Sequence, residues 1–281
     1  MASRFPILFL FLALFSGLAS AGQGDDDGQL ERSVCGLQEP FMFWLWSGMA
    51  GSPNADRLAG LRNVEETVFE TRDNRLLRGY KLKATGAEGQ LTSPQGYLLV
   101  MQGNAILADQ IIGAFTPFAS AGFDVYVYDF RGYGRSDGKR RLKAIVSDYV
   151  EILAALDAAD YEHHLVYAMS FGGVAFLDGF ESHARVDRII VDSAPSRLSD
   201  YGCPTEFDPV NHLPADCRHF LFIVGQNDRV VRPAMSRELV ESAQQRGAEV
   251  LRDAAFGHPF MDYDRSVHRR RLQLIEDYLL R

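Results

Sequence analysis

The chain has 281 residues, 47% of them hydrophobic and 23% charged. These proportions are typical of a folded globular protein and exclude a disordered, collagen-like or coiled-coil chain, and the length suits one domain with a large core. Acidic residues (37) outnumber basic ones (29) and give a net charge of −8, so we do not expect nucleic acid as a partner. The short basic runs at 139–141 and 269–271 are expected to be solvated faces.

The first 21 residues have the three-part pattern of a secretory signal peptide. A short start with Arg4 precedes an apolar run at 5–18, and a small-residue cleavage site follows at 19–21. Because the apolar run is shorter than the roughly 20 residues that span a bilayer, we expect cleavage at this site and export to the periplasm or the extracellular space. An uncleaved membrane anchor is the alternative. Residues 22–60 are expected to form an N-terminal extension.

The three cysteines are Cys35, Cys203 and Cys217. Export to an oxidising compartment permits a disulfide. We expect Cys203 to pair with Cys217, which are close in the sequence, and the alternative is that Cys35 pairs with either of them. The cysteines lack the C-x-x-C spacing of a metal site, so no metal is expected.

An aromatic segment in the extension holds both tryptophans of the chain. Its residues Phe41, Phe43, Trp44 and Trp46 suit a peripheral contact with a membrane surface. The favoured alternative is that the segment packs on the domain.

The remaining sequence predicts a mixed, mainly parallel sheet with helices on both faces. An antiparallel hairpin is expected first, and after it apolar runs typical of buried strands alternate with segments of helical spacing, which indicates βαβ units. The expected strands are 65–71, 76–83, 97–101, 124–128, 165–168, 188–191, 220–224 and 249–252, and the expected helices are 106–121, 142–158, one from 171, 233–246 and 266–279.

The strongest local motif surrounds Ser170, where an expected strand meets an expected helix. In a nucleophile elbow this junction is so tight that the residues two positions before and after the serine must be small. Here they are Ala168 and Gly172. The motif therefore predicts that Ser170 projects above the sheet as a nucleophile.

A serine nucleophile needs a base, which an acid in turn orients. Asp228 and His258 each follow a later strand, in the chain order serine, acid, histidine. Both are therefore expected at the carboxyl edge of the sheet, where open α/β sheets build their sites. Asp192, at the end of the preceding strand, is the alternative acid, and His212 is the alternative histidine.

These motifs, in this order, resemble the α/β-hydrolase superfamily over nearly the whole mature chain. The segment 100–104 resembles the loop that carries the oxyanion hole, and 129–136 resembles the D-x-R-G-x-G-x-S loop of these enzymes. The resemblance is greatest to small single-domain serine hydrolases with an N-terminal export or anchor segment. It implies an α/β-hydrolase fold over 61–281 with a minimal lid at about 194–218.

The resemblance also implies the residue roles. Ser170 would attack a carbonyl carbon, His258 would transfer its proton, and Asp228 would orient the imidazole. The backbone N–H groups of Phe171 and Asn104 would bind the oxyanion. The expected substrate is a carboxylic ester or thioester, without a metal or an organic cofactor. The alternatives are a peptidase or amidase with the same residues, and a non-catalytic binding protein.

Overall fold

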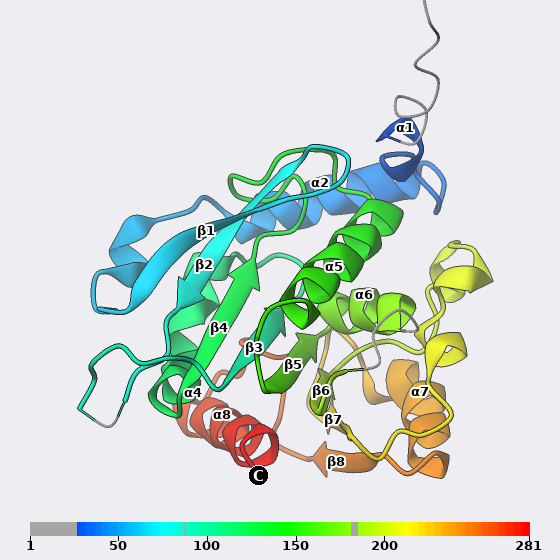
Figure 1. Cartoon of the computed structure of the whole chain (residues 1–281). Coiled ribbons are helices and arrows are strands. Elements are labelled where there is room, and N and C mark those ends of the chain that lie inside the picture. The colour runs from blue at the N-terminus through cyan, green and yellow to red at the C-terminus, as the bar shows by residue number, and fades with distance from the viewer. Residues whose placement is uncertain (1–26, 87, 181–184) are drawn as a thin grey trace, which may run out of the picture.

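A computed structural model describes residues 27–86, 88–180 and 185–281, and the expected signal peptide lies outside these ranges. An eight-stranded sheet in the order β1-β2-β4-β3-β5-β6-β7-β8 crosses the molecule (Figure 1). The strands are β1 (Val64–Glu70), β2 (Leu76–Leu82), β3 (Gly96–Met101), β4 (Phe123–Tyr128), β5 (His163–Met169), β6 (Arg188–Asp192), β7 (Phe220–Gly225) and β8 (Glu249–Asp253).

The expected antiparallel hairpin is confirmed as β1 and β2, and β2 also pairs antiparallel with β4. Every other pair in the sheet is parallel. The three strands β3, β4 and β7 are buried along their whole length, as parallel strands covered on both faces are. In this order β3 and β5 are neighbours, so the loops that follow them meet at the same edge of the sheet.

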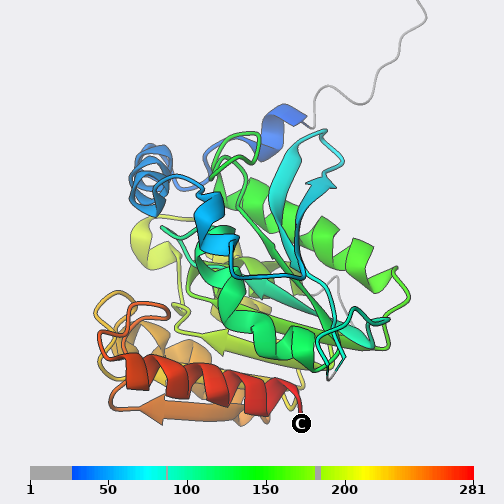
Figure 2. The same ribbon diagram turned by 90° about the vertical axis from the view of Figure 1, so that its left-hand side faces the viewer.

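Helices cover both faces of the sheet, as expected (Figures 1 and 2). One hydrophobic cluster joins the sheet to α5, α6 and α7, and a second joins it to α3, α4 and α8. Their bounds are α3 (Ala108–Ile111), α4 (Thr116–Ser120), α5 (Leu142–Asp157), α6 (Phe171–Gly179), α7 (Pro233–Gln245) and α8 (Arg265–Leu279).

The helix expected at 106–121 is interrupted. A 3-10 turn, Ile112–Phe115, separates α3 from α4. Pro117 has no N–H to bond to the carbonyl oxygen of Gly113, and the hydroxyl of Thr116 donates to that oxygen instead. The proline was a visible signal for the break.

The N-terminal extension packs on the domain through α1 (Asp27–Leu30) and α2 (Gln38–Ala50). The buried carboxylate of Glu39 accepts hydrogen bonds from the N–H groups of Val34, Cys35 and Leu142. None of the described helices combines the length and apolar character needed to cross a membrane.

The expected Cys203–Cys217 disulfide is wrong: Cys35 pairs with Cys203, and Cys217 is a buried free thiol. The N–H of Cys217 donates to the carbonyl oxygen of Arg246 beyond α7, which holds it at the start of β7. Cys203 lies instead beside the start of α2, where Gln38 donates to the carbonyl oxygen of Tyr201.

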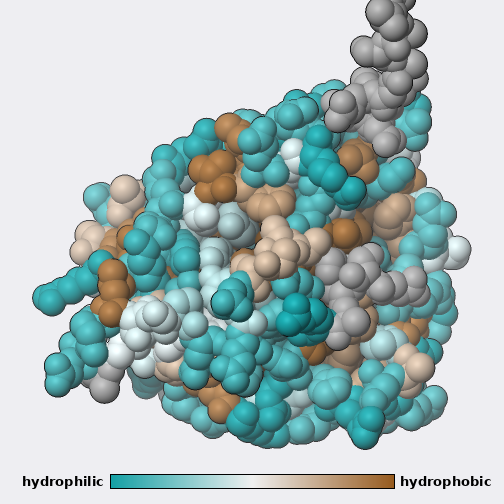
Figure 3. Space-filling model, viewed as in Figure 1, coloured by the Kyte–Doolittle hydropathy of each residue, from teal (hydrophilic) through white to brown (hydrophobic). Residues whose placement is uncertain are grey.

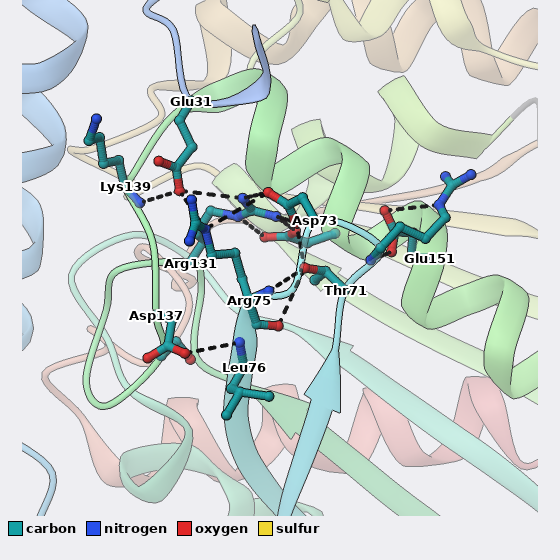
Figure 4. Close-up of polar contacts among 12 residues, drawn as sticks. Glu31, Thr71, Asp73, Arg75, Leu76, Arg131, Asp137, Lys139 and Glu151 are labelled. Carbon is teal, nitrogen blue, oxygen red and sulfur yellow. Dashed lines mark hydrogen bonds and ion pairs between the residues drawn. The ribbon is translucent and has the colours of Figure 1, made fainter. Parts of the chain in front are cut away.

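A buried ionic network ties the extension to the loop after β4 (Figure 4). The guanidinium of Arg131, which is fully buried, donates to Asp73 and Asp148 and contacts Glu31. Glu31 also accepts from Arg75 and from the N–H of Lys139. Burying an arginine is tolerable when carboxylates surround it, so this network fixes the loop 129–136 and residue 31 together.

Candidate active site

Ser170 lies at the turn between β5 and α6 with a strained backbone. Its φ of 52° and ψ of −119° are in a region that residues with a side chain rarely adopt. A Cβ at Gly172 would lie 2.1 Å from the carbonyl oxygen of Met101, so only glycine fits there. The loop after β3 also lies against the turn, although less closely, since a Cβ at Gly103 would lie 3.2 Å from Cβ of Ser170. Gly172 is therefore needed because the end of β3 lies directly against the turn.

Asp228 and His258 form a hydrogen-bonded pair. The distance from Asp228 Oδ2 to His258 Nδ1 is 2.8 Å, and Asp228 Oδ1 accepts from the N–H groups of Val230 and Val231. Burial of the Asp228 carboxyl would raise its pKa, but the hydrogen bond and charge of His258, with the two N–H groups, lower the pKa below its usual value. The carboxylate is thus held ionised against the imidazole.

The loops that carry this pair pack backbone against backbone. The N–H of Asn227 donates to the carbonyl oxygen of Phe256 at 3.0 Å. A Cβ at Gly225 would lie 2.4 Å from that oxygen, so the approach requires glycine. A cleft lined by Asn227, Arg229, Met261 and Tyr263 borders His258.

The carboxylate of the alternative acid, Asp192, binds partners other than His258. Both of its carboxylate oxygens accept from Arg271 at 3.0 Å, and Oδ2 also accepts from the Tyr167 hydroxyl. Its backbone oxygen accepts the N–H of Ser170 at 2.8 Å. Asp192 therefore fixes the serine turn through its backbone oxygen, whereas Asp228 orients the imidazole of His258.

The alternative histidine, His212, lies in the insert. Its Nε2 is 2.7 Å from the carbonyl oxygen of Glu206 and 3.8 Å from Asp178 on α6. The insert itself follows the expected short form: between β6 and β7 the chain makes three 3-10 turns, Ser199–Tyr201, Thr205–Phe207 and Pro209–His212.

The role of Arg271 in holding the histidine loop was not predicted from the sequence. Its run of three arginines was expected to be solvated, but Arg271 is 1% exposed and donates to the carbonyl oxygen of Gly257, beside His258. Asp262 completes this arrangement by accepting the N–H of Gly257 at 2.7 Å. A signal was available, since Arg271 lies at helical spacing between Val267 and Ile275, on the apolar face of α8.

The expected oxyanion donors belong to the two segments that meet at Ser170, the start of α6 and the loop after β3. Phe171 is the first residue of α6, where backbone N–H groups have no intrahelical acceptor. Across the turn, Asn104 Oδ1 accepts from the Tyr133 hydroxyl at 2.9 Å, and Ala105 has a φ of 62°. The resulting loop keeps Gly103 against the serine.

Ser170 and the Asp228–His258 pair follow β5, β7 and β8, so all three residues lie at the carboxyl edge of the sheet. Among the described residues, Asp228 bonds to His258, but neither bonds to the Ser170 hydroxyl. The extension also reaches this edge: the ring of Phe43 on α2 packs edge-on against Phe171, with ring centroids 5.3 Å apart. Phe43 was expected among the membrane-contacting aromatics, but it is buried.

The fold is that of the α/β hydrolases, and the chain is similar to members of this superfamily. The family model described as "Serine aminopeptidase, S33" matches residues 92–207. An esterase from Pyrococcus furiosus, Pf2001, superposes with a TM-score of 0.62 at 16% identity, covering 82% of this chain and 96% of the esterase. Esterase 2 from Thermogutta terrifontis superposes with a TM-score of 0.60 at 16% identity, covering 78% and 95% of the two chains.

A curated relative is the polyketide transferase claH from Penicillium crustosum. It is 26% identical over 159 residues, which are 54% of this chain and 50% of the relative. The chain thus spans about half the length of this relative.

Proposed function

We propose that the protein is a serine hydrolase that cleaves a carboxylic ester or thioester through an acyl-enzyme. The observation that carries the proposal is the strained turn at Ser170, at the same sheet edge as the ionised Asp228 and its imidazole partner. Backbone strain of this kind is retained where the surrounding structure enforces it and is typical of functional sites.

In the proposed reaction the Ser170 hydroxyl oxygen bonds to the substrate carbonyl carbon, and its proton passes to His258 Nε2. The N–H groups of Phe171 and Asn104 stabilise the charged oxygen of the tetrahedral intermediate. The bond to the leaving group then breaks, and the leaving alcohol or thiol takes the proton from His258. A water molecule then attacks the carbonyl carbon of the acyl-enzyme while His258 accepts its proton. The bond to the Ser170 oxygen breaks, that oxygen takes the proton from His258, and the carboxylic acid is released. Hydrogen bonds between nucleophile and base often tighten only when substrate binds.

The test is labelling of the purified protein with a fluorophosphonate, followed by mapping of the labelled peptide. The similar esterase from Thermogutta terrifontis is phosphoramylated by tabun, which makes an organophosphorus probe suitable. Ser170→Ala should abolish labelling. Ser193→Ala is the matched control, because Ser193 is a buried serine with a φ of 58° immediately after the neighbouring strand β6, and this variant should keep the label.

Absence of labelling in the folded protein would contradict the proposal and favour a non-catalytic binding protein. The matched family model favours a peptidase as the second candidate, since the same residues cleave amides. A comparison of p-nitrophenyl esters with aminoacyl p-nitroanilides distinguishes the two, and a higher kcat/KM for the anilides would favour the peptidase.

We also propose that the protein is exported, with cleavage after Ala21. The supporting observations are the signal-peptide pattern and the Cys35–Cys203 disulfide, which suits an oxidising compartment. Expression of the full chain in a secreting host, followed by mass spectrometry of the N-terminal peptide, tests this. Export predicts a chain that begins at Gly22, whereas an intact N-terminus would indicate the anchor.

A further inference from the structure

Helix α2 presents an apolar face to solvent. Its inner side is buried through Glu39, Phe43 and Ala50. Figure 2 shows the helix nearly end-on at the outer edge of the molecule. On the outer side, large apolar residues recur at helical spacing with exposed fractions from 40% to 95%, and we call this set the α2 outer face: Leu37, Phe41, Trp44, Leu45 and Met49.

An exposed face of this composition is unusual for a soluble domain. Surface helices normally carry polar residues opposite their buried stripe, whereas contiguous exposed apolar patches mark surfaces that bind a partner or a membrane. Figure 3 shows the face toward the viewer in Figure 1, where teal hydrophilic atoms surround scattered brown groups, and α2 lies behind that face. We therefore expect the α2 outer face to bind a partner or a membrane.

A basic cluster lies beside this helix. The Arg140 guanidinium donates to the Ser47 hydroxyl on α2, and the N–H of Leu142 donates to Glu39 of the same helix. Within the described ranges, none of the four basic side chains of this cluster forms an ion pair with a carboxylate. They are Lys139, Arg140, Arg141 and Lys143.

This charge is local, because the protein as a whole carries a net charge of −8. Apolar side chains flanked by unpaired cations match the chemistry of a bilayer with anionic headgroups, which attract basic groups near the surface. A protein partner would need to be both apolar and acidic over the same area.

We propose that the α2 outer face binds the surface of a membrane that contains anionic phospholipid. Trp44 and Phe41 enter the interface, and the basic cluster contacts the headgroups. The proposal does not depend on the proposed hydrolase activity. If both hold, the contact of Phe43, on the inner side of α2, with Phe171 places the serine turn across this helix from the lipid surface.

The two tryptophans provide the test, because they differ in exposure on the same helix. The full chain is reconstituted with vesicles that contain brominated phosphatidylcholine, with or without phosphatidylglycerol. Trp46→Phe leaves Trp44, 63% exposed, as the only tryptophan, and Trp44→Phe leaves Trp46, which packs against Phe43 with ring centroids 5.6 Å apart. Lipid bromine should quench Trp44 and leave Trp46 largely unquenched, and phosphatidylglycerol should increase the quenching.

Charge variants test the role of the basic cluster. Lys139→Gln combined with Lys143→Gln should lower the quenching of Trp44 on anionic vesicles, with an apparent affinity loss of about five-fold per lysine. Lys83→Gln, at a partly exposed lysine paired with Glu65 on the hairpin, is the matched control and should behave like the parent.

Unquenched Trp44 on vesicle-bound protein would overturn the proposal. Blue-shifted Trp44 emission without quenching would mean that the N-terminal run or a second copy of the chain covers the face, and this result would also overturn it. Equal quenching with and without phosphatidylglycerol would contradict the role of the basic cluster.

Discussion

The guanidinium of Arg271 donates to the carbonyl oxygen of Gly257, the residue that precedes His258. The same arginine pairs with Asp192 and with Asp262. Asp192 in turn accepts the N–H of Ser170 through its backbone oxygen. One buried cation thus connects the backbone of the serine turn to the backbone of the histidine loop, through side chains that need not touch a substrate.

Arg271→Lys should lower kcat while leaving KM nearly unchanged. Lysine keeps the charge but loses the planar fork that contacts three groups at once, so the histidine loop is less well positioned. Esterase assays over a range of pH should show a reduced plateau. The matched control is Arg270→Lys, at an exposed neighbour that pairs with Asp253, and equal kinetics of the two variants would contradict the positioning role.

Arg271→Met should destabilise the fold by about 3–5 kcal/mol, because it leaves two buried carboxylates without their cation. Urea unfolding followed by circular dichroism measures this loss. An unfolding free energy within about 1 kcal/mol of the parent would mean that Asp192 and Asp262 find other partners.

Counting the free thiols of the denatured protein tests the Cys35–Cys203 disulfide. Denatured protein should show one free thiol before reduction, that of Cys217, and three after it. Cys35→Ser should lower the free energy of unfolding by about 5 kcal/mol in the chain-entropy model, since the loop is long, and Cys217→Ser should leave the disulfide intact. Three free thiols before reduction would contradict the pairing.

Asp178→Asn should stabilise the protein at neutral pH. Burial and the charge of Asp208 raise the pKa of Asp178 to about 8, and its carboxylate oxygens have no hydrogen-bond partner among the described residues. A raised carboxyl pKa contributes stability that is fully present below about pH 4 and is lost as the pH rises to 8. The free energy of unfolding of the variant should exceed that of the parent by an amount that grows over this interval by about 1.4 kcal/mol per pH unit, and the difference in Tm should grow with it.

The control for this measurement is Asp208→Asn, which removes the neighbouring charge. It should lower the pKa of Asp178 and flatten the pH dependence of the parent. Parallel Tm curves for the parent and Asp178→Asn between pH 4 and 8 would show that the carboxyl titrates normally.

Gly172→Ala should impair folding and activity together. The added Cβ would lie 2.1 Å from the carbonyl oxygen of Met101, so β3 and the serine turn must separate, at a cost of a few kcal/mol. Gly48→Ala on α2 meets no atom within 4 Å and should be neutral or slightly stabilising. Thermal unfolding of both variants, read beside fluorophosphonate labelling, measures the difference.

Local patterns were sufficient to predict most of the architecture. Alternating apolar runs and helical stripes define the sheet and its helices, because these signals are short-range. The turn at Ser170 could be predicted because the residues that permit it, Ala168 and Gly172, are its sequence neighbours. The expectation that Asp228 orients His258 came from their positions after two later strands and from the resemblance, with Asp192 left as the alternative acid. In the structure the two strands, β7 and β8, are neighbours.

What the sequence did not predict depends on contacts between distant residues. Cys35 and Cys203 are 168 positions apart, and nothing in either segment indicates that α2 lies beside the insert. The burial of Arg271 depends on Asp192, 79 positions away. Phe43 and Trp44 are adjacent in one apolar segment, and only the folded domain determines which of them is covered.

The Cys35–Cys203 bond closes most of the chain into a covalent ring. The ring contains the nucleophile turn, whereas Asp228 and His258 lie on the open C-terminal arm. A protease that cuts one loop inside the ring leaves both fragments joined until the bond is reduced, whereas a cut between Cys203 and Asp228 severs the histidine arm from the rest at once. The covalent consequence of a cut therefore depends on its position. A single cleavage between Cys203 and Asp228 breaks the covalent link between the two halves of the site, whereas one inside the ring does not.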